Sequence, residues 1–262
     1  MQQLAGKRAL ITGSTQGLGL AAAQRLAEAG CDVLLNGFGD APTIAAIQRD
    51  IETRHGVRAM YSPADLRNAD DIERMIIEAQ ATLGAFDIVV NNAVVRHTGA
   101  IEALAPTAWD EALAVNLSSA FHTIRLTLPG MKQRNWGRIV NVSSIYGLTA
   151  APNRVGYVTT KTALLGLTRA VALETTGYDI TCNAVCPGTS ATPVHEAALA
   201  RLMDGDRLSR DDAERQLLAG RQPTGRLISP DGVAALMVFL CGPDSRDITG
   251  ATLPIDGGWS AM

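Results

Sequence analysis

The chain has 262 residues, of which 47% are hydrophobic and 19% are charged, and its net charge is −3. This composition is ordinary for a globular protein, and the length is sufficient for one large core. A mildly acidic chain offers no electrostatic attraction to nucleic acid or to an anionic membrane, so we expect neither as a partner.

Signals for targeting and for metal binding are missing from the sequence. The first seven residues lack the apolar segment of a signal peptide, and no run of about 18 apolar residues follows, which favours a cytoplasmic protein. The four cysteines, at positions 31, 182, 186 and 241, stand in apolar contexts, where we expect buried free thiols. Neither Cys-x-x-Cys nor His-Glu-x-x-His occurs, so no metal site is predicted.

Short apolar runs alternate with longer amphipathic stretches from one end of the chain to the other. The runs expected to be strands span 8–12, 32–36, 58–61, 86–91, 138–142, 180–186 and 252–255. The stretches expected to be helices span 18–29, 42–54, 69–83, 106–133, 156–175 and 230–241. Nearly continuous apolar strands are typical of sheets covered on both faces. The alternation predicts a single α/β domain over 1–262, of the Rossmann type, with three layers and a doubly wound parallel sheet of seven strands.

One segment departs from the alternation. Residues 194–226 contain helical pieces but no strand, and they carry six arginines, at 201, 207, 210, 215, 221 and 226. The segment follows the sixth expected strand, so residues 190–226 are expected to form a helical substrate lid over the carboxyl ends of the strands, where ligands of α/β proteins bind. A solvated helical hairpin without that role fits the pattern equally well.

Residues 12–19 read Thr-Gly-Ser-Thr-Gln-Gly-Leu-Gly and join the first expected strand to the first expected helix. Gly13 permits a tight turn, Gly17 lets the backbone approach a pyrophosphate, and Gly19 lets the helix pack closely on the sheet. The helix N-terminus adds free N–H groups and a partial positive charge. The motif lacks the Gly-Lys-Ser/Thr of a P-loop, so it predicts a dinucleotide site rather than an NTPase site.

The sequence around this turn favours NAD over NADP. A 2′-phosphate needs a cation near the turn or just past the second strand. Residues 14–16 and 36–40 supply none, and Asp40 would repel a phosphate. No acidic residue ends the second strand itself, so the usual positive mark of an NAD site is missing too. Asp65, after the third strand, is a candidate acceptor for the adenine amino group.

Tyr157 and Lys161 are four residues apart, with Ser144 13 positions before the tyrosine and Asn116 28 positions before the serine. In a helix, the four-residue spacing places both side chains on one face. An ammonium there favours phenolate over phenol and lowers the tyrosine pKa. Of the 23 basic residues 20 are arginines, so a lysine at this position is an informative choice of a compact charge. The pair therefore predicts a proton-transfer site.

Together these residues resemble the short-chain dehydrogenase/reductase family over almost the whole chain. The motifs that carry the resemblance are TGSTQGLG at 12–19, Asp65, Asn91-Asn92-Ala93, Asn116, Ser144, Tyr157 with Lys161, and Pro187-Gly188 followed by Thr192. One departure is Val94, where the family usually has Gly, and this change is expected to shift the loop near the nicotinamide ribose. The resemblance also implies a homotetramer, formed through the helices expected at 106–133 and 156–175.

The resemblance implies an alcohol oxidation with four catalytic residues. Tyr157 as phenolate takes the hydroxyl proton while hydride passes from the carbinol carbon to C4 of the nicotinamide. Lys161 lowers the pKa of Tyr157 and holds the nicotinamide ribose, and Ser144 hydrogen-bonds the reacting oxygen. Asn116 is expected to hold a water that links Lys161 to solvent. The implied cofactor contacts are Gly13, Thr15, Gly17, Leu18, Gly19, Phe38, Asp65, Leu66, Asn92, Ala93, Tyr157, Lys161, Pro187, Gly188 and Thr192.

Within the family, the chain is most similar to the bacterial D-3-hydroxybutyrate dehydrogenases, which are NAD-dependent. The segments that support this similarity are 35–41, 96–98, 116–118, 172–175 and 256–259. The resemblance implies interconversion of a small 3-hydroxy acid and its 3-oxo acid. D-3-hydroxybutyrate and acetoacetate are the leading pair, and a larger or more anionic hydroxy acid is the next.

The residues expected to contact the acid end of the substrate depart in part from that subfamily. His97 matches it, Ser144 and Tyr157 hold the reacting end, and Trp259 is expected to close the pocket. Where the subfamily has Gln, His and Lys, this chain has Arg96, Tyr146 and Arg154, and it has Thr189 for a Trp and Ala198 for a lid Gln. Two arginines can each fork onto a carboxylate, so we expect an anion site of altered shape, with more room near the lid.

Two other interpretations stay open. A reductase of 3-oxoacyl thioesters, or of a sugar or cyclic alcohol, would explain the loss of the Gln and the Trp, and it predicts use of NADPH. A catalytically silent NAD-binding or scaffold protein is the alternative from another class. The intact set of Asn116, Ser144, Tyr157 and Lys161 argues against the silent protein.

Overall fold

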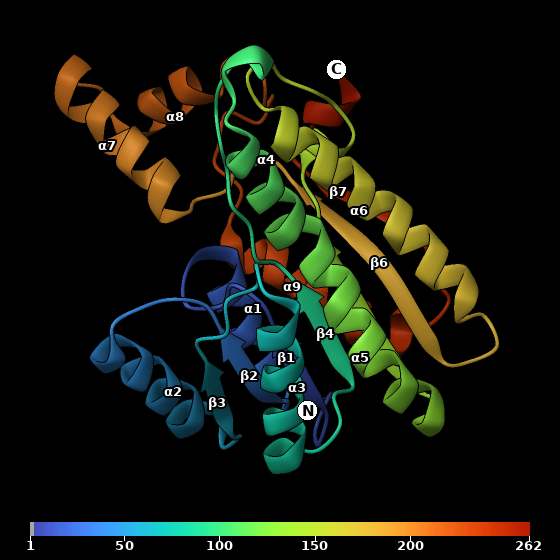
Figure 1. The fold of residues 1–262 in the computed structure, drawn as a ribbon. Helices are drawn as coiled ribbons and strands as arrows, with labels where there is room; N and C mark the ends of the chain where they lie inside the picture. The colour runs from blue at the N-terminus through green and yellow to red at the C-terminus, as the bar shows by residue number, and fades with distance from the viewer. Residues whose placement is uncertain (1–2) are drawn as a thin grey trace.

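Seven parallel strands form one sheet in the order β3-β2-β1-β4-β5-β6-β7 (Figure 1). The computed structural model describes residues 3–262. Its strands are β1 (Arg8–Ile11), β2 (Asp32–Asn36), β3 (Ala59–Ser62), β4 (Ile88–Asn91), β5 (Gly137–Val142), β6 (Ile180–Pro187) and β7 (Thr252–Ile255). Every pairing between neighbouring strands is parallel. The doubly wound sheet predicted from the alternating segments is thus confirmed.

The direction of winding reverses between β1 and β4. The chain runs outward from β1 to β2 and β3, returns to β4 on the other side of β1, and then continues outward to β7. Loops that follow the two central strands therefore turn away from each other, and ligands of open α/β sheets bind in the crevice between them. The residues directly after β1 and β4 border this crevice.

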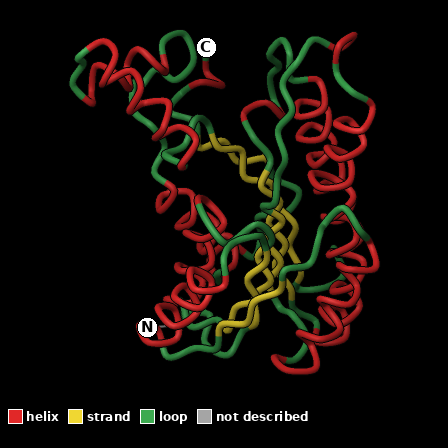
Figure 2. The backbone as a smooth tube through the Cα atoms, turned by 60° about the vertical axis from the view of Figure 1, so that its left-hand side comes forward, coloured by secondary structure: helices red, strands yellow, loops and turns green. Residues whose placement is uncertain are grey.

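Helices cover both faces of the sheet (Figure 2). One layer contains α1 (Gly17–Glu28), α2 (Ala41–His55) and α9 (Pro230–Cys241), and the other contains α3 (Ala69–Leu83), α4 (Pro106–Leu113), α5 (Ser119–Arg134) and α6 (Val155–Glu174). Short 3₁₀ turns are η1 (Ile101–Ala103), η3 (Ile145–Gly147), η4 (Pro243–Ser245) and η5 (Trp259–Ala261). In the layers, α1 packs on α9, α3 on α5, and α4 on α6.

The central strand β1 shows why the strands must be apolar at every position. Ala9 and Ile11 pack into the core beneath α1 and α9, whereas Leu10 packs into the core beneath α3 and α5. All three side chains are fully buried. Successive residues of a strand point to opposite faces, so a sheet with two helical layers needs a continuous apolar run.

One predicted element is wrong, because residues 106–133 do not form one helix. A π-helical turn (Ala114–Ser118) separates α4 from α5. Such a turn holds one more residue than an α-helical turn, a difference that apolar periodicity does not reveal. Asn116 lies within it. The other predicted boundaries agree with the observed ones to within two residues.

The segment after β6 forms the helices α7 (Pro193–Asp206) and α8 (Arg210–Leu218), as expected for a part of the chain without a regular strand. The two helices pack on each other and lie beyond the carboxyl ends of the strands (Figure 1). A single parallel bridge between Ser190 and Ile228 joins the two ends of the segment. The two ends of the segment are therefore tied to each other at the base of the helical pair.

The four cysteines are buried and free, as their apolar contexts predict. Burial raises the pKa of the Cys182 thiol to about 12, so the thiol stays protonated and packs as a small apolar group. Within residues 3–262, no helix has both the length and the apolar character needed to cross a membrane.

Candidate active site

The turn after β1 is built around glycines that leave no room for a side chain. A Cβ on Gly19 would lie 2.2 Å from the carbonyl oxygen of Gly13 and 2.4 Å from Nδ2 of Asn92. Gly13 has a φ of +62°, and a Cβ there would lie 2.8 Å from Cα of Ala93. No described side chain caps the N-terminus of α1. Its N–H groups therefore stay available to a phosphate, next to a backbone that a ligand can approach closely.

The end of β4 holds this turn in place. Nδ2 of Asn92 donates to the carbonyl oxygens of Thr12 at 3.0 Å and of Gly13 at 2.9 Å. Oγ1 of Thr12 accepts from the backbone N–H groups of Asn92 at 2.9 Å and of Ala93 at 3.1 Å. Asn92 and Ala93 thus border the crevice and also fix its shape. Thr12 was not predicted as a site residue, although its place at the head of the glycine motif was a usable signal.

The loop after β2 offers an aromatic ring and no cation. Oγ1 of Thr15 donates to the carbonyl oxygen of Phe38 at 2.9 Å, and the Phe38 side chain is 68% exposed. The Asp40 carboxylate accepts from the backbone N–H of Thr43, and this bond holds the pKa of Asp40 below its ordinary value. Residues 36–40 contain no Lys or Arg. The segment therefore presents an apolar ring next to a fixed negative charge.

Asp65 and Leu66 differ in what they can offer to an adenine. Oδ2 of Asp65 accepts from Nη2 of Arg67 at 2.5 Å, and the hydrogen bonds from Arg67 lower the pKa of the Asp65 carboxyl. The Leu66 side chain is buried in the core next to α3. Leu66 is left with only its backbone for a cofactor contact. Arg67, which sequence reasoning missed, already occupies part of the Asp65 carboxylate.

The residues predicted to move a proton meet at the carboxyl end of β5. Tyr157 and Lys161 lie one turn apart on α6 and are only 7% and 2% exposed. Nζ of Lys161 lies 5.9 Å from the centre of the Tyr157 ring and donates to the carbonyl oxygen of Val142 at 2.6 Å. Ser144 lies two residues after the end of β5, is 6% exposed, and hydrogen-bonds Tyr157. The structure therefore brings the predicted Ser, Tyr and Lys together.

Burial and charge act against each other on Tyr157. Burial disfavours the phenolate and is the largest single effect, but Lys161, Arg96 and the hydrogen bond with Ser144 together outweigh it and lower the pKa of Tyr157 from 10.0. Burial also lowers the pKa of the Lys161 ammonium, against the attraction of Tyr157. A tyrosine with a lowered pKa can act as a general base closer to neutral pH.

Close packing fixes Ser144 relative to Lys161. Oγ of Ser144 accepts from the backbone N–H of Tyr146 at 3.1 Å, and Oγ of the neighbouring Ser143 donates to the carbonyl oxygen of Lys161 at 2.8 Å. A Cβ on Gly147 would lie 2.4 Å from Oγ of Ser143 and 2.9 Å from that same carbonyl oxygen. The absence of a side chain at residue 147 therefore allows the turn η3 to lie this close to α6. Neither Ser143 nor Gly147 was predicted from the sequence.

The side chain of Asn116 is committed to the loop after β4. Its Oδ1 accepts from the backbone N–H of Val95 at 2.8 Å. Its Nδ2 donates to the carbonyl oxygen of Val95 at 3.0 Å and to Oγ1 of Thr160 at 3.2 Å. Both amide hydrogens are thereby used, so a water near Asn116 would have to bind through an oxygen atom of this residue. The observed contacts tie α6 and the loop before Arg96 to the π-helical turn.

Arginines and aromatic rings line the side of the site where the acid end of a substrate is expected. Cζ of Arg96 lies 5.4 Å from the centre of the Tyr157 ring, and Cζ of Arg154 lies 5.9 Å from the centre of the Tyr146 ring. The Tyr146 ring packs edge-on against Tyr157 at 6.2 Å and against Trp259 at 5.5 Å, measured between ring centres. Arg96 and Tyr146 therefore adjoin Tyr157 directly, and Arg154 and Trp259 adjoin it through Tyr146.

His97 is a predicted substrate contact that the structure does not bring into the cleft. Its Nε2 lies 2.8 Å from Oε2 of Glu111 on α4, so one ring nitrogen is already paired with a carboxylate of the protein. His195, in the first turn of α7, lines the cleft instead. Its Nδ1 lies 2.8 Å from the carbonyl oxygen of Ser190 and 3.1 Å from Oγ1 of Thr192. Sequence reasoning missed His195, which had no motif around it.

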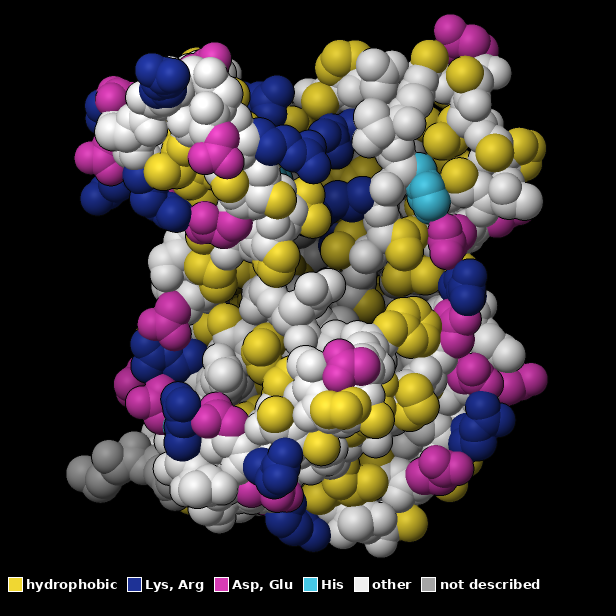
Figure 3. All heavy atoms as spheres, turned by 90° about the vertical axis from the view of Figure 1, so that its left-hand side faces the viewer, with side chains coloured by type: hydrophobic (Ala, Val, Ile, Leu, Met, Phe, Trp, Pro, Cys, Tyr) yellow, Lys and Arg dark blue, Asp and Glu magenta, His cyan; other side chains and the backbone are white. Residues whose placement is uncertain are grey.

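A cleft runs from the glycine-rich turn to Tyr157, beneath the α7–α8 pair. Figure 3 shows the molecule hollowed between this pair and the opposite lobe, with Lys and Arg side chains on the walls. The residues that line the cleft are Leu18, Asn92, Val94, Arg96, Val142, Ser143, Ser144, Tyr157, Lys161, Pro187, Gly188, Ser190, Thr192 and His195. It therefore joins predicted cofactor contacts to the predicted catalytic residues in one continuous space.

Gln222 connects the far end of the helical pair to the turn after β6. Its Oε1 accepts from the backbone N–H of Thr189 at 2.9 Å, and its side chain is 2% exposed. A Cβ on Gly188 would lie 2.6 Å from that oxygen and 3.0 Å from Cα of Asp256. The Pro187-Gly188 turn is therefore held from both sides. Gln222 was not predicted, because its partner lies 33 residues away in the sequence.

The fold and the arrangement around Tyr157 define the class of protein. A family profile described as "Enoyl-(Acyl carrier protein) reductase" matches residues 13–260. The chain belongs to the short-chain dehydrogenase/reductase family, whose members use nicotinamide cofactors and act on alcohol and ketone groups.

The chain is similar to hydroxy-acid dehydrogenases and to a sugar reductase. D-beta-hydroxybutyrate dehydrogenase of Cupriavidus necator is 44% identical over 259 residues, which cover 99% of this chain and all of the relative. D-beta-hydroxybutyrate dehydrogenase of Rhizobium meliloti is 39% identical over 256 residues, which cover 98% and 99% of the two chains. L-sorbose reductase from Gluconobacter frateurii, solved with NADPH and L-sorbose, superimposes over all of both chains with a TM-score of 0.93 at 26% identity.

Proposed function

We propose that the protein is an NAD-dependent dehydrogenase of a small 3-hydroxy acid, with D-3-hydroxybutyrate and acetoacetate as the leading pair. The observation that carries the proposal is the position of Arg96, whose guanidinium lies over the ring of the buried Tyr157 in the cleft. A cation there can hold a carboxylate beside the carbon that reacts. The names of the two curated relatives point to the same class of substrate.

The residues present fit a dinucleotide. Gly19 and Gly13 form a cradle that a Cβ would fill, and the uncapped N-terminus of α1 opens onto it. We propose that the cradle holds the pyrophosphate, that Phe38 and Asp65 border the adenosine, and that Leu18, Asn92 and Ala93 face the nicotinamide half. Pro187, Gly188 and Thr192 would border the nicotinamide from the other side of the cleft. Bound NAD⁺ supplies the acceptor for the hydride.

The chemistry that the chain itself performs is a proton transfer. Tyr157, held near Lys161 and Arg96, takes the hydroxyl proton of the substrate as hydride leaves the carbinol carbon, so that a 3-oxo acid, NADH and one proton are produced. Ser144 donates a hydrogen bond to the oxygen on which charge develops. Lys161 stabilises the phenolate and holds the nicotinamide ribose. Asn116 fixes the positions of Val95 and α6. We propose that it also holds a water that links Lys161 to solvent.

The choice of NAD rests on charge. A 2′-phosphate bound after β2 would meet the carboxylate of Asp40 and no basic side chain among residues 36–40. Since a phosphate is repelled by a neighbouring carboxylate and finds no cation in this segment, the segment disfavours NADP. We further propose that residues 190–226 act as a lid, that the protein is a cytoplasmic homotetramer, and that residues 1–262 form one domain.

A substrate panel tests the proposal directly. With NAD⁺ and then NADP⁺ at equal concentration, D-3-hydroxybutyrate should be oxidised faster with NAD⁺, and butan-2-ol, which lacks the carboxylate, should react at least about tenfold more slowly per unit concentration. Formation of NADH is followed by its absorbance. Equal turnover of the acid and the neutral alcohol would contradict the carboxylate contact, and a preference for NADP⁺ would contradict the assignment of the cofactor.

A second candidate is a reductase of a sugar, a cyclic alcohol or a 3-oxoacyl thioester. The observation that favours it is the superposition on L-sorbose reductase over the whole chain. Such an enzyme would prefer NADPH and tolerate neutral substrates. Reduction of L-sorbose or of an acetoacetyl thioester with NADPH, at rates above those for acetoacetate with NADH, would select this candidate.

A further inference from the structure

His195 lines the cleft but takes no part in the transfer of proton and hydride proposed above. It lies in the first turn of α7, and its ring is half-buried. Nδ1 of the ring lies 2.8 Å from the carbonyl oxygen of Ser190, an atom that can only accept a hydrogen bond. Nδ1 therefore carries a proton, and in the neutral ring Nε2 is the nitrogen with a free lone pair.

The surroundings of His195 keep the ring neutral. Burial lowers its pKa and is the largest effect, and the positive charge of Arg96 lowers the pKa further, although the bond to the carbonyl group of Ser190 acts in the opposite direction. The pKa of His195 is therefore below its ordinary value, and Nε2 keeps its lone pair at neutral pH.

Nε2 of His195 has no hydrogen-bond partner within residues 3–262. The hydrogen bonds of the ring are made through Nδ1, which Ser190 and Oγ1 of Thr192 share. Among the described residues, the buried side-chain atoms that lack a partner are Nε of Arg138 and Oγ1 of Thr181, so Nε2 of His195 is accessible to solvent. An accessible acceptor on the wall of a cleft is available to a ligand that carries an O–H or N–H group.

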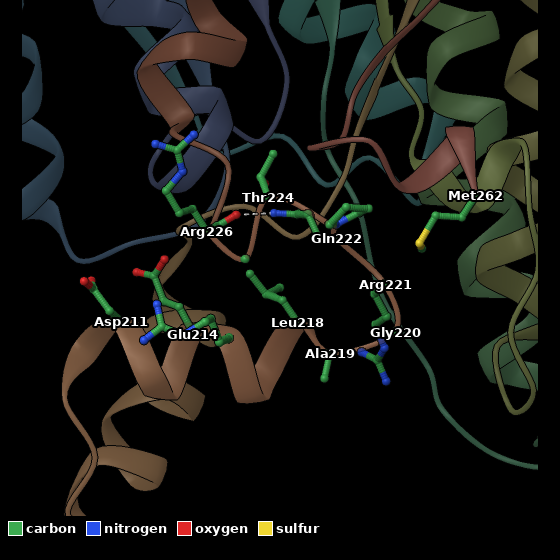
Figure 4. A pocket seen from close by; sticks show the side chains of 13 residues that line it. Asp211, Glu214, Leu218, Ala219, Gly220, Arg221, Gln222, Thr224, Arg226 and Met262 are labelled. Carbon is green, nitrogen blue, oxygen red and sulfur yellow. Dashed lines mark hydrogen bonds between the residues drawn. The ribbon is translucent and has the colours of Figure 1, made fainter.

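The carbonyl group that orients the ring is itself fixed. Ser190 is 3% exposed and forms the parallel bridge with Ile228. Just before Ile228, the carbonyl oxygen of Arg226 accepts a hydrogen bond from the buried side chain of Gln222 (Figure 4). The base of the helical pair therefore holds His195 in one orientation, as a residue that selects a ligand requires.

The order of the strands places Ser144 between Arg96 and His195. β4, β5 and β6 are neighbours in the sheet, and these three residues follow them in the order Arg96, Ser144, His195. All three line the cleft. Ser144 hydrogen-bonds Tyr157, so the reacting oxygen proposed to lie there has Arg96 towards β4 and His195 towards β6. A hydroxy acid whose carboxylate contacts Arg96 would extend its other substituent towards His195.

We propose that Nε2 of His195 accepts a hydrogen bond from a second hydroxyl group of the substrate, on the carbon next to the carbinol carbon and away from the carboxylate. The inference rests on the proposed function and specifies its substrate class as 3,4-dihydroxy acids. A site with an oriented acceptor disfavours a substrate that lacks the donor, because the acceptor is then left unpaired. The oxidation itself is unchanged, since this hydrogen bond transfers neither proton nor hydride.

The test compares two acids of nearly equal size. 3,4-Dihydroxybutyrate carries the second hydroxyl group, and 3-hydroxypentanoate carries a methyl group in its place. With saturating NAD⁺ and matching configuration at the carbinol carbon, kcat/KM should be at least about fivefold higher for the dihydroxy acid, the value expected for one neutral hydrogen bond. An equal or lower kcat/KM for the dihydroxy acid overturns the proposal.

Matched variants separate the hydrogen bond from packing. In His195→Asn, the amide nitrogen can still donate to Ser190 but no acceptor replaces Nε2, so the ratio of kcat/KM for the two acids should fall by about fivefold. His195→Gln places an amide oxygen near the position of Nε2 and should keep the ratio to within about twofold. The control His97→Asn, at a ring paired with Glu111, should also keep the ratio.

Circular dichroism confirms that the variants are folded. If both His195 variants lower the ratio equally, the residue acts through packing and the proposed hydrogen bond is wrong.

The carboxamide of the nicotinamide is the other donor that could reach Nε2. Titration of each variant with NADH, followed by fluorescence, distinguishes the two donors. His195→Asn should bind NADH as the unaltered protein does. If this variant instead binds NADH more weakly and loses kcat/KM equally for both acids, the acceptor serves the cofactor and the proposal is wrong.

Failure of this proposal differs from failure of the proposed function. If D-3-hydroxybutyrate is oxidised with NAD⁺ but the dihydroxy acid does not exceed 3-hydroxypentanoate, only the contact with a second hydroxyl group is disproved. If no 3-hydroxy acid is oxidised with either dinucleotide, the proposed function itself is wrong.

Discussion

The two halves of the cleft are held by different kinds of contact. On the half proposed to bind the nucleotide, the turn at Gly13 is fixed by backbone and amide hydrogen bonds from Asn92 and Thr12, and contacts of under 3 Å exclude any added Cβ. On the half proposed to bind the substrate, Arg96 and Arg154 lie over aromatic rings and have no carboxylate partner among the described residues. A rigid half suits a cofactor of constant shape, and adaptable charged side chains suit a substrate that differs between relatives.

Replacement of Tyr157, the proposed base at the junction of the halves, should have the largest effect. Tyr157→Phe removes the oxygen that accepts the substrate proton, so kcat should fall by about 10²–10⁴-fold, while the affinity for NADH measured by fluorescence changes little. The control Tyr146→Phe keeps the ring that packs on Tyr157 and Trp259 and should lose far less. Full activity of Tyr157→Phe would rule out the proton transfer proposed here.

The rigidity of the nucleotide half is tested by adding one methyl group. Gly19→Ala places a Cβ 2.2 Å from the carbonyl oxygen of Gly13, so the turn must move. We expect thermal unfolding to show a loss of about 1–3 kcal/mol in the free energy of unfolding, and fluorescence titration to show a weaker affinity for NADH. Gly166→Ala on α6 is the control, because no neighbour lies within 4 Å of its Cβ, and it should gain about 0.5–1 kcal/mol. Unchanged NADH affinity in Gly19→Ala would show that the turn is not rigid.

The charge of Arg96 couples the two halves through Tyr157. Oxidation requires the phenolate, so kcat/KM rises with pH through the pKa of Tyr157, which lies below 10.0 because Lys161 and Arg96 favour the charged form. Arg96→Gln removes one of these charges and raises that pKa, so the rise should move to higher pH. At a pH below this rise, kcat/KM of Arg96→Gln for the hydroxy acid should also be about tenfold lower than that of the unaltered protein.

A control for Arg96 is Arg49→Gln, at an exposed arginine that donates to the carbonyl oxygen of Ala45 far from the cleft. Its pH profile should coincide with that of the unaltered protein. If the profile of Arg96→Gln coincides as well, Arg96 does not influence the base, and its role is limited to binding.

The smallest effect is expected at His97, which faces Glu111 rather than the cleft. His97→Asn should change kcat/KM by less than about twofold, as for other replacements away from a functional contact. His195→Asn should have a larger effect, since His195 lines the cleft. If His97→Asn loses as much activity as His195→Asn, the prediction is wrong and His97 contributes to the substrate site.

The sequence predicted well wherever a feature is local. The strands follow from apolar runs, the turn at 12–19 from glycine spacing, and the Tyr157–Lys161 pair from the four-residue period of a helix. Each of these signals lies within a few neighbouring residues, and local conformation is governed by the same residues that carry the signal. The seven parallel strands followed from such features, whereas the meeting of Ser144 with Tyr157 was expected from the family resemblance.

The sequence predicted poorly wherever a partner lies far along the chain. The π-helical turn at Asn116 interrupts an unbroken helical pattern, and the bond from Asn116 to Val95 spans 21 residues. Gln222 reaches Thr189 over 33 residues. For the same reason, His97 was expected in the cleft and His195 was not. Tertiary packing, and not the spacing of residues in the sequence, decides which side of a loop faces a ligand.

The sequence by itself determined the residues of the proposed chemistry, because a base, its charged neighbour and a phosphate-binding turn each need particular residues at fixed short spacings. Only the tertiary structure decided that Arg96 lies over the ring of Tyr157 and Arg154 over the ring of Tyr146, because these residues come from separate segments that the fold brings together. Charges act through space and not along the chain, so the proposed contact with an anion depends on where the strands end.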